Sequence, residues 1–379
     1  MPKLPLVGHQ LSRETEGRVI GDAGGGELAG VVFRCDGSLS IGMGHVVRCS
    51  ALAHVLGKRG HNIRFVMGEL PGSACDFVRR AGFPVEAIAC PSSEQDASLT
   101  EQDLERTAEA ARRSHARCVV VDHYGAASGY LGKMKDLGIT VAVIDDLADR
   151  DLTSADWLLN QNLGAAGLVY RTRPDCVKLL GPAYALLRPE FGAVRGHLSR
   201  KFSAGDRRVL LTFGGGDADQ LCAEVLDALN VATGRLEVRC VLGGEGAVPA
   251  SLTRSAASSR HEVEILRKAG NMAELMAWAD LSINGGGSTC WELCCLGVPM
   301  VVLVLAPDQA LNASALDRQG CAFSLGEWRA DTRARLARLV DDLLAEPGKR
   351  EAMSRASRAL VDGAGPERAA DSLMALAGR

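Results

Sequence analysis

Three times along this chain, a short apolar stretch runs into a glycine-rich turn and then into a helical pattern. The turns lie at 37–44, 214–216 and 285–287. In such a unit the free backbone N–H groups and the positive end of the helix dipole meet at the turn, which favours a bound anion. Tight packing alone accounts for any single glycine turn, whereas three together favour a ligand that contains a diphosphate.

Strands and helices alternate in both halves of the sequence. In the first half, apolar runs predict strands at 31–33, 63–67, 85–88, 118–121, 140–144 and 157–159, with helical stretches at 45–56, 73–80, 101–114 and 130–136. In the second half, strands are predicted at 209–213, 237–242, 263–266, 281–283 and 300–305, with helices after the glycine turns. This alternation is typical of parallel sheets that are covered by helices on both faces.

The regular alternation breaks near 186–203, where prolines and a run of basic and polar residues occur. We place a domain junction there and predict an α/β protein with two Rossmann-like domains and a ligand in the cleft between them. The first domain is expected to span 31–195. The second is expected to span 206–379, with its last helix able to pack back on the first domain, and 1–30 to form a flexible N-terminal extension.

Composition excludes several classes of protein. The 379 residues are 47% hydrophobic, and a net charge of -3 provides no basic field for nucleic acid. No apolar run is long enough and uncharged enough to span a bilayer. The 12 cysteines show no CxxC pair, which indicates reduced core thiols in a cytoplasmic protein.

His45 is the candidate catalytic residue of the first glycine turn. A histidine in the first turn of a helix feels the positive end of the dipole, which favours its neutral form. A neutral imidazole beside an anion-binding turn can act as a general base. The alternative is an ordinary, partly buried histidine.

Other reactive side chains follow predicted strands or lie on a predicted helix. The segment 122–125 (Asp-His-Tyr-Gly) ends an apolar strand, where α/β proteins place functional side chains. The aspartate pair 145–146 repeats that placement; bracing of neighbouring loops is the preferred interpretation, and metal binding is the alternative. Cys290, Cys294 and Cys295 are interpreted as buried thiols in preference to metal ligands. We therefore predict no metal and no cofactor.

Seven segments are distinctive when they are taken together. They are RCDGSLSIGMGHVVRC (34–49), VDHYG (121–125), VIDDLADR (143–150), LLNQNLGA (158–165), LLGPAYALLRPEF (179–191), LLTFGGGDADQ (210–220) and INGGGSTCWELCCLGVPMVVLVLAPDQ (283–309). This set resembles the family of UDP-2,4-diacetamido-2,4,6-trideoxy-β-L-altropyranose hydrolases of pseudaminic acid biosynthesis.

The resemblance implies a glycosyltransferase-B type fold, with UDP held mainly by the second domain. It also implies metal-independent hydrolysis of a UDP-sugar at its anomeric carbon. By the same resemblance His45 is the base and Tyr124 lies beside the sugar. One departure concerns Asp308-Gln309, where the family usually shows Asn-Gln. An acceptor-only carboxylate there replaces an amide that can also donate, which bears on the identity of the sugar.

We therefore predict a nucleotide-sugar hydrolase that releases UDP and the free sugar, with His45 activating water. The predicted substrate-binding residues are Asp36, Gly44, Arg48, Tyr124 and Asp308. The predicted UDP-binding residues are Gly215, Gly216, Asp217, Gly286, Gly287, Ser288, Thr289, Glu292 and Gln309. The alternatives are a UDP-sugar glycosyltransferase of the same fold and a non-catalytic UDP-sugar binding protein. The expected partner is the small-molecule UDP-sugar, and the oligomeric state is left open.

Overall fold

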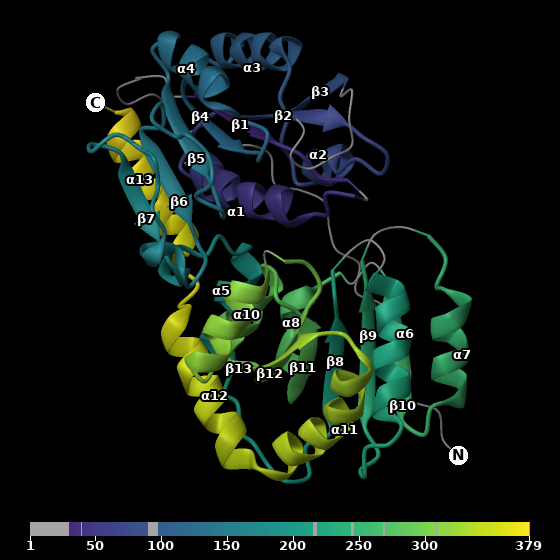
Figure 1. Cartoon of the computed structure of the whole chain (residues 1–379). Helices are drawn as coiled ribbons and strands as arrows, with labels where there is room; N and C mark the ends of the chain where they lie inside the picture. Colours follow the sequence, from purple (N-terminus) through teal and green to yellow (C-terminus); the bar gives the residue numbers. More distant parts are fainter. Residues whose placement is uncertain are drawn as a thin grey trace, which may run out of the picture.

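The computed structural model describes residues 30–38, 40–89, 98–214, 218–243, 246–267, 270–307 and 309–378. These residues form two β-sheets, and Figure 1 shows each sheet with helices packed around it. All neighbouring strands in both sheets are parallel. The predicted α/β class with parallel sheets is therefore confirmed.

The first sheet contains seven strands. They are β1 (Gly30–Cys35), β2 (Ile63–Glu69), β3 (Val85–Ala89), β4 (Ala116–Asp122), β5 (Thr140–Ile144), β6 (Trp157–Asn160) and β7 (Val177–Leu180). Their order across the sheet is β3-β2-β1-β4-β5-β6-β7. The order reverses direction between β1 and β4, and ligands of such sheets bind beside this point at the carboxyl ends of the strands.

Helices cover both faces of the first sheet. They are α1 (Gly44–Lys58), α2 (Cys75–Arg80), α3 (Glu101–Arg113) and α4 (Ser128–Asp136), with short 3₁₀ turns η1 (Ala165–Gly167) and η2 (Pro182–Tyr184). Successive side chains of a strand point to opposite faces. Val31 and Phe33 therefore pack with α1 and α2, while Val32 packs with α3 and α4. This explains the unbroken apolar run of β1, since both of its faces are buried.

The second sheet contains six strands, β8 (Arg208–Thr212), β9 (Glu237–Leu242), β10 (Glu262–Arg267), β11 (Leu281–Gly285), β12 (Met300–Val304) and β13 (Ala322–Glu327). Their order is β10-β9-β8-β11-β12-β13, which repeats the reversal of the first sheet. The later helices are α5 (Pro189–His197), α6 (Ala218–Leu229), α7 (Ala250–Ser258), α8 (Met272–Trp278), α9 (Thr289–Leu296), α10 (Gln309–Arg318), α11 (Ala330–Ala345), α12 (Pro347–Leu360) and α13 (Gly365–Ala377). Side chains of α6, α7 and α11 pack in one core of this sheet, and those of α5, α8, α9 and α10 pack in the other.

The helix α13 leaves the second domain and packs on the first. Figure 1 shows α12 beside the second sheet and α13 beside β6, β7 and α1. Ala369, Ala370 and Leu373 of α13 belong to the same buried cluster as Leu52 and Leu56 of α1. The chain therefore crosses between the two sheets twice, once before β8 and once before α13.

Some local predictions differ from the structure. The junction at 186–203 contains the helix α5, because Pro189 occupies a first-turn position, where a missing N–H costs nothing. The short strands β7 and β13 were not predicted, and each lies at the edge of its sheet with a single strand partner.

Among the helices in the described part of the chain, none is both long enough and apolar enough to cross a membrane.

Candidate active site

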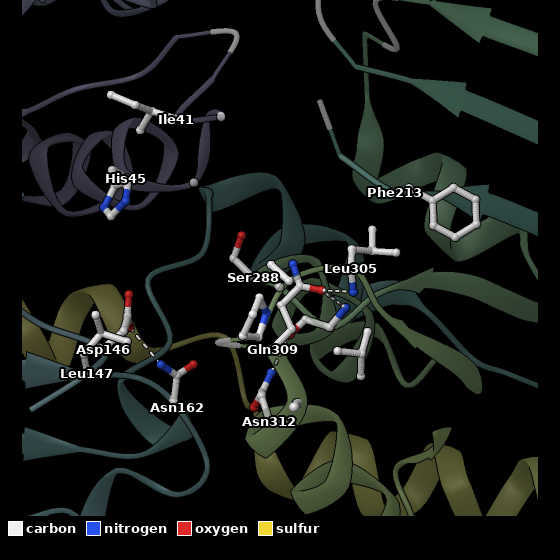
Figure 2. Close-up of a pocket in the computed structure, with 18 of the residues that line it drawn as sticks. Ile41, His45, Asp146, Leu147, Asn162, Phe213, Ser288, Leu305, Gln309 and Asn312 are labelled. Atoms are coloured by element: carbon white, nitrogen blue, oxygen red, sulfur yellow. Dashed lines mark hydrogen bonds between the residues drawn. The ribbon is translucent and has the colours of Figure 1, made fainter. Parts of the chain in front are cut away.

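A cleft of about 1390 Å³ lies between the two domains. Its first-domain wall is formed by the turns after β1, β4, β5 and β6, and its second-domain wall by the turns after β8, β11, β12 and β13. Figure 2 shows His45 and Ile41 on one side of the cleft, facing Ser288 and Gln309 on the other. The cleft therefore lies at the carboxyl ends of both sets of strands, where α/β sheets bind ligands.

His45 and Asp122 form a hydrogen-bonded pair at the cleft wall. The helix α1 begins at Gly44, so His45 lies in its first turn, and β4 ends at Asp122. The distance from Nδ1 of His45 to Oδ1 of Asp122 is 2.7 Å. A carboxylate only accepts hydrogen bonds, so this contact places the proton on Nδ1. In that tautomer Nε2 carries the lone pair, as a general base requires.

Arg48 lies one helical turn after His45 and binds two carboxylates. Its Nε and one terminal nitrogen donate to Asp122 at 2.6 and 2.7 Å, and its other terminal nitrogen donates to Asp146 at 2.8 Å. Burial raises the pKa of Asp122, but Arg48 and then His45 outweigh burial and hold this pKa well below its ordinary value. Asp122 therefore stays charged and holds the imidazole in place.

Tyr124 lies between the base and Asp146. Its ring meets the ring of His45 edge to face, with the centroids 5.1 Å apart, and its hydroxyl donates to Asp146 at 2.9 Å. Burial, and then the charge of Asp146, raise the pKa of Tyr124 well above its ordinary value. The hydroxyl group is therefore protonated at neutral pH.

The two aspartates at 145–146 have different surroundings. Asp145 is fully buried; it accepts from the backbone N–H of Ala148 at 2.7 Å and from Arg150 at 3.0 Å. Arg150 in turn donates to the carbonyl oxygens of His123 and Tyr124, which fixes the turn after β4. Asp145 thus braces that turn, in agreement with the interpretation preferred for the aspartate pair. Asp146, in contrast, lines the cleft.

On the second domain, the glycine turn after β11 is fixed by Gln309. Its Oε1 accepts from the backbone N–H of Gly286 at 3.0 Å and from that of Leu305 at 3.2 Å. A Cβ atom at Gly286 would lie 3.0 Å from Cβ of Gln309, so glycine permits this close approach. The turn leads into the N-terminus of α9, whose N–H groups and dipole favour an anion.

The glycine turns of the two domains meet across the cleft. A Cβ atom at Gly44 would lie 3.9 Å from Oγ of Ser288, so the N-termini of α1 and α9 are neighbours. Ser288 is exposed, and its hydroxyl makes no cap hydrogen bond. Two helix N-termini therefore point their positive ends toward one small region between the domains.

Apart from Asp36, the predicted site residues fall into three groups in the structure. Those that line the cleft are Gly44, His45, Arg48, Tyr124, Gly286, Gly287, Ser288 and Gln309. Thr289 begins α9, and Glu292 lies one turn further on, where it pairs with Arg188 at 3.2 Å; the residues that line the cleft include neither of them. Gly215, Gly216, Asp217 and Asp308 lie outside the described residues.

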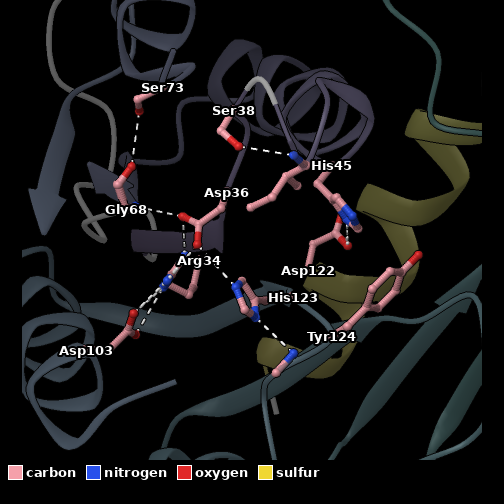
Figure 3. A network of polar contacts seen from close by, with 12 residues as sticks. Arg34, Asp36, Ser38, His45, Gly68, Ser73, Asp103, Asp122, His123 and Tyr124 are labelled. Atoms are coloured by element: carbon pink, nitrogen blue, oxygen red, sulfur yellow. Dashed lines mark hydrogen bonds and ion pairs between the residues drawn. The ribbon is translucent and has the colours of Figure 1, made fainter. Parts of the chain in front are cut away.

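Asp36 lies beneath the turn after β1 and is almost completely buried. Figure 3 shows its carboxylate held by Arg34, by the backbone N–H of Gly68 and by His123. Arg34 also pairs with Asp103, which anchors the network in α3. With its oxygens engaged in these contacts, Asp36 supports the turn from below, and the cleft is lined by other residues.

Several side chains that line the cleft are not among the predicted site residues. They include Asp146, Gln161, Asn162, Phe213, Trp291, Asn312 and Trp328. Asp122 was noted at a strand end but was not selected as the partner of the base. The sequence held a signal for Asn162, because this residue lies two positions after the buried strand β6 within the segment LLNQNLGA. The sequence held no such signal for Trp328 or Phe213, since isolated aromatic residues are ordinary core side chains.

Within the described residues, no group of three or more His, Cys, Asp or Glu side chains is arranged to hold a metal ion.

In the comparison with known proteins, a family model matches residues of the second domain. Residues 208–369 match the family model of the glycosyltransferase family 28 C-terminal domain. The chain is 25% identical to the spore coat polysaccharide biosynthesis protein SpsG of Bacillus subtilis, over 87% of this chain and 93% of that protein. It is 27% identical to the uncharacterized protein MJ1062 of Methanocaldococcus jannaschii, over 71% of this chain and 54% of that protein.

A third relative carries the name of an activity. It is the UDP-N-acetylglucosamine–N-acetylmuramyl-(pentapeptide) pyrophosphoryl-undecaprenol N-acetylglucosamine transferase of Xanthomonas axonopodis pv. citri, which is 31% identical over 51% of this chain and 46% of that protein. The chain thus spans about half the length of this relative and of the Methanocaldococcus protein.

Solved structures establish the fold. Acinetobacter baumannii MurG superposes with a TM-score of 0.64 at 17% identity, covering 92% of this chain and 99% of MurG. The calicheamicin glycosyltransferase CalG4 superposes with a TM-score of 0.61 at 18% identity, covering 93% of this chain and 99% of CalG4. The chain has the two-domain glycosyltransferase-B type fold, and that prediction is confirmed.

Proposed function

We propose that this protein is an enzyme that acts on a UDP-sugar and breaks the bond between the anomeric carbon and the diphosphate. One observation carries the proposal: His45, the candidate base held by Asp122, lines the same cleft as the glycine turn at 286–288. A UDP-sugar presents the same two parts, a reactive carbon and an adjacent diphosphate. The match to a glycosyltransferase C-terminal domain and the UDP-N-acetylglucosamine transferase relative support UDP as the nucleotide.

In the proposed mechanism, Nε2 of His45 takes a proton from an incoming hydroxyl group or water molecule. The oxygen then attacks the anomeric carbon, and the carbon–oxygen bond to the diphosphate breaks with its electron pair leaving on UDP. The backbone N–H groups at the start of α9 and the dipole of that helix stabilise the charge of the departing diphosphate. The carboxylate of Asp122 stabilises the imidazolium that forms on His45.

Two nucleophiles fit this scheme. Water gives the hydrolysis that the sequence motifs favour, with release of a free diacetamido-trideoxy sugar for nonulosonic acid synthesis. A hydroxyl group of a second substrate gives glycosyl transfer, which the comparisons support better, because the family model and the relative with a named activity are transferases. Typical ligand pockets measure about 300–1,000 Å³, and this cleft is larger. It therefore has room for a UDP-sugar together with either nucleophile.

The test is incubation of the full chain with a panel of UDP-sugars, with UDP and free sugar both quantified. A hydrolase releases the two in equal amounts without any acceptor. A transferase releases UDP only when an acceptor is added, and the sugar then appears in the product. Binding of UDP without turnover of any member of the panel would leave the third alternative, a UDP-sugar binding protein.

A further inference from the structure

Asp146 joins three side chains of the first-domain wall of the cleft. Its Oδ2 accepts from the hydroxyl of Tyr124 at 2.9 Å and from Arg48 at 2.8 Å, and its Oδ1 accepts from Nδ2 of Asn162 at 2.8 Å. The donors come from three places in the first domain: Arg48 from α1, Tyr124 from the turn after β4 and Asn162 from the turn after β6. The general base mechanism does not use Asp146 or Asn162, so their arrangement requires another explanation.

This arrangement fixes the hydrogen-bond polarity of the wall. A carboxylate has no proton to donate, so Asn162 must turn its NH₂ toward Asp146 and keep its oxygen on the other side. Figure 2 shows the Asn162 oxygen pointing toward the middle of the cleft, away from Asp146. The Tyr124 proton is likewise engaged by Asp146, which leaves the lone pairs of its oxygen. Both groups therefore accept hydrogen bonds from a ligand.

The net charge of the first-domain wall also favours a ligand group that donates hydrogen bonds. Arg48 carries one positive charge against the two carboxylates of Asp122 and Asp146, which leaves this group with a net charge of about −1. The nearby Asp145–Arg150 pair adds no net charge. On the second-domain wall, Glu327 adds a carboxylate and the N-terminus of α9 presents N–H donors to a ligand. Each wall thus suits a different part of one ligand.

We propose that Asn162 and Tyr124, oriented by Asp146, form the sugar-specificity surface of the cleft. This surface accepts hydrogen bonds from hydroxyl or amide N–H groups of an uncharged sugar and disfavours a sugar that carries a carboxylate. Asn162 is the specificity-determining residue, and Asp146 is a positioning residue. The inference rests on the proposed function, because the diphosphate must occupy the opposite wall for the sugar to reach this one.

The test compares the dissociation constants of UDP, UDP-N-acetylglucosamine and UDP-glucuronic acid for the full chain by calorimetry. In the wild type, UDP-glucuronic acid binds at least about tenfold more weakly than UDP-N-acetylglucosamine, because like charges oppose each other at the wall. In Asp146→Asn this ratio narrows by about tenfold, while the constant for UDP alone changes by less than about twofold. The matched control is Asp149→Asn, which removes an exposed charge from the same loop outside the cleft and leaves the ratio unchanged.

A second variant tests the acceptor role. Asn162→Leu has a similar volume and no hydrogen-bond acceptor, so UDP-N-acetylglucosamine loses about fivefold or more in affinity relative to UDP. An unchanged ratio of the two sugars in Asp146→Asn, or an equal loss for UDP and UDP-N-acetylglucosamine in Asn162→Leu, would overturn the inference. Absence of UDP binding in the wild type would instead overturn the proposed function itself, and this inference with it.

Discussion

At the scale of single residues, the pairing of His45 with a charged, buried carboxylate sets the chemistry of the cleft. The Asp122 oxygen takes the Nδ1 proton, so Nε2 has the lone pair, and Arg48 keeps the carboxylate ionised. Tyr124 packs edge to face against the imidazole ring and limits its rotation. The base is thus held in one orientation and one tautomer before any ligand binds.

Replacement of His45 by alanine is expected to lower the turnover of a UDP-sugar by about 10²–10⁴-fold, the usual contribution of a general base. UDP affinity should change little, since the proposed UDP contacts lie on the second domain. Turnover is measured as UDP release and affinity by calorimetry. His54→Ala is the matched control, because His54 lies on the same helix outside the cleft lining. Full turnover in His45→Ala would show that another group is the base.

The charge of Asp122 also makes a prediction for stability. Because its pKa is held below the ordinary value of about 4, its contribution to the free energy of unfolding is present above about pH 4 and is lost as the pH falls further. Asp122→Asn should therefore destabilise the protein by about 1–3 kcal/mol at pH 7, and the difference from the wild type should shrink between pH 4 and pH 2.

Urea unfolding of both proteins across this pH range measures the effect. Asp76→Asn serves as the control, since Asp76 forms an exposed surface pair with Arg79 that contributes little. A difference between Asp122→Asn and the wild type that stays constant from pH 7 to pH 2 would contradict the assigned charge state.

At the scale of elements, the second-domain wall depends on the contact between α10 and the glycine turn before α9. Gln309→Ala removes the oxygen that accepts from the N–H groups of Gly286 and Leu305. The N–H of Leu305 then loses this acceptor, and the N–H of Gly286 keeps only the carbonyl oxygen of Leu303. The glycine turn is held less firmly, so UDP should bind with about 1–3 kcal/mol less free energy, roughly a five- to 150-fold loss of affinity. Calorimetry with UDP measures this. Gln319→Ala is the control, because Gln319 is exposed and lies just after the end of α10, and this variant should bind UDP normally. Equal UDP affinity in the two variants would show that Gln309 does not support the UDP site.

The sequence predicted the elements that carry a clear apolar pattern. The strands β1, β4 and β11 were found because each is a short, buried run that ends at, or is followed directly by, a glycine or an aspartate. The strands β7 and β13 were missed; each lies at a sheet edge, and its short run contains a polar residue, Lys178 or Ser324. The helix α5 was missed, because its prolines and charges resemble those of a linker.

The candidate site was predicted in part, for a reason of topology. His45 was recognisable from its own turn, since the local sequence sets the start of α1. Its partner Asp122 comes from β4, and only the pairing of β1 with β4 brings the two together. That pairing joins residues far apart in the sequence, so local pattern could not reveal it. The same holds for Asn162, which reaches Asp146 from the turn after β6.

At the scale of the whole molecule, the two crossings between the domains touch each other. A Cβ atom at Gly365 would lie 2.2 Å from the carbonyl oxygen of Ala185, so glycine is required where α13 begins. Gly365→Ala should therefore lower the free energy of unfolding by about 1–3 kcal/mol, the usual cost of overpacking. Thermal unfolding measures it. Gly348→Ala, at a helical position with open space around it, should be neutral or slightly stabilising; equal melting temperatures for the two variants would contradict the close contact.

The return of α13 to the first domain has a consequence for how the protein is made. Domains usually fold one after another as the ribosome releases them, starting from the N-terminus. Here Ala369, Ala370 and Leu373 fill the same core as α1, so the first domain cannot complete its interior until the second has been translated. The first domain is therefore completed after the second has been made. Through most of its synthesis, the growing chain exposes the apolar surface that α13 later covers.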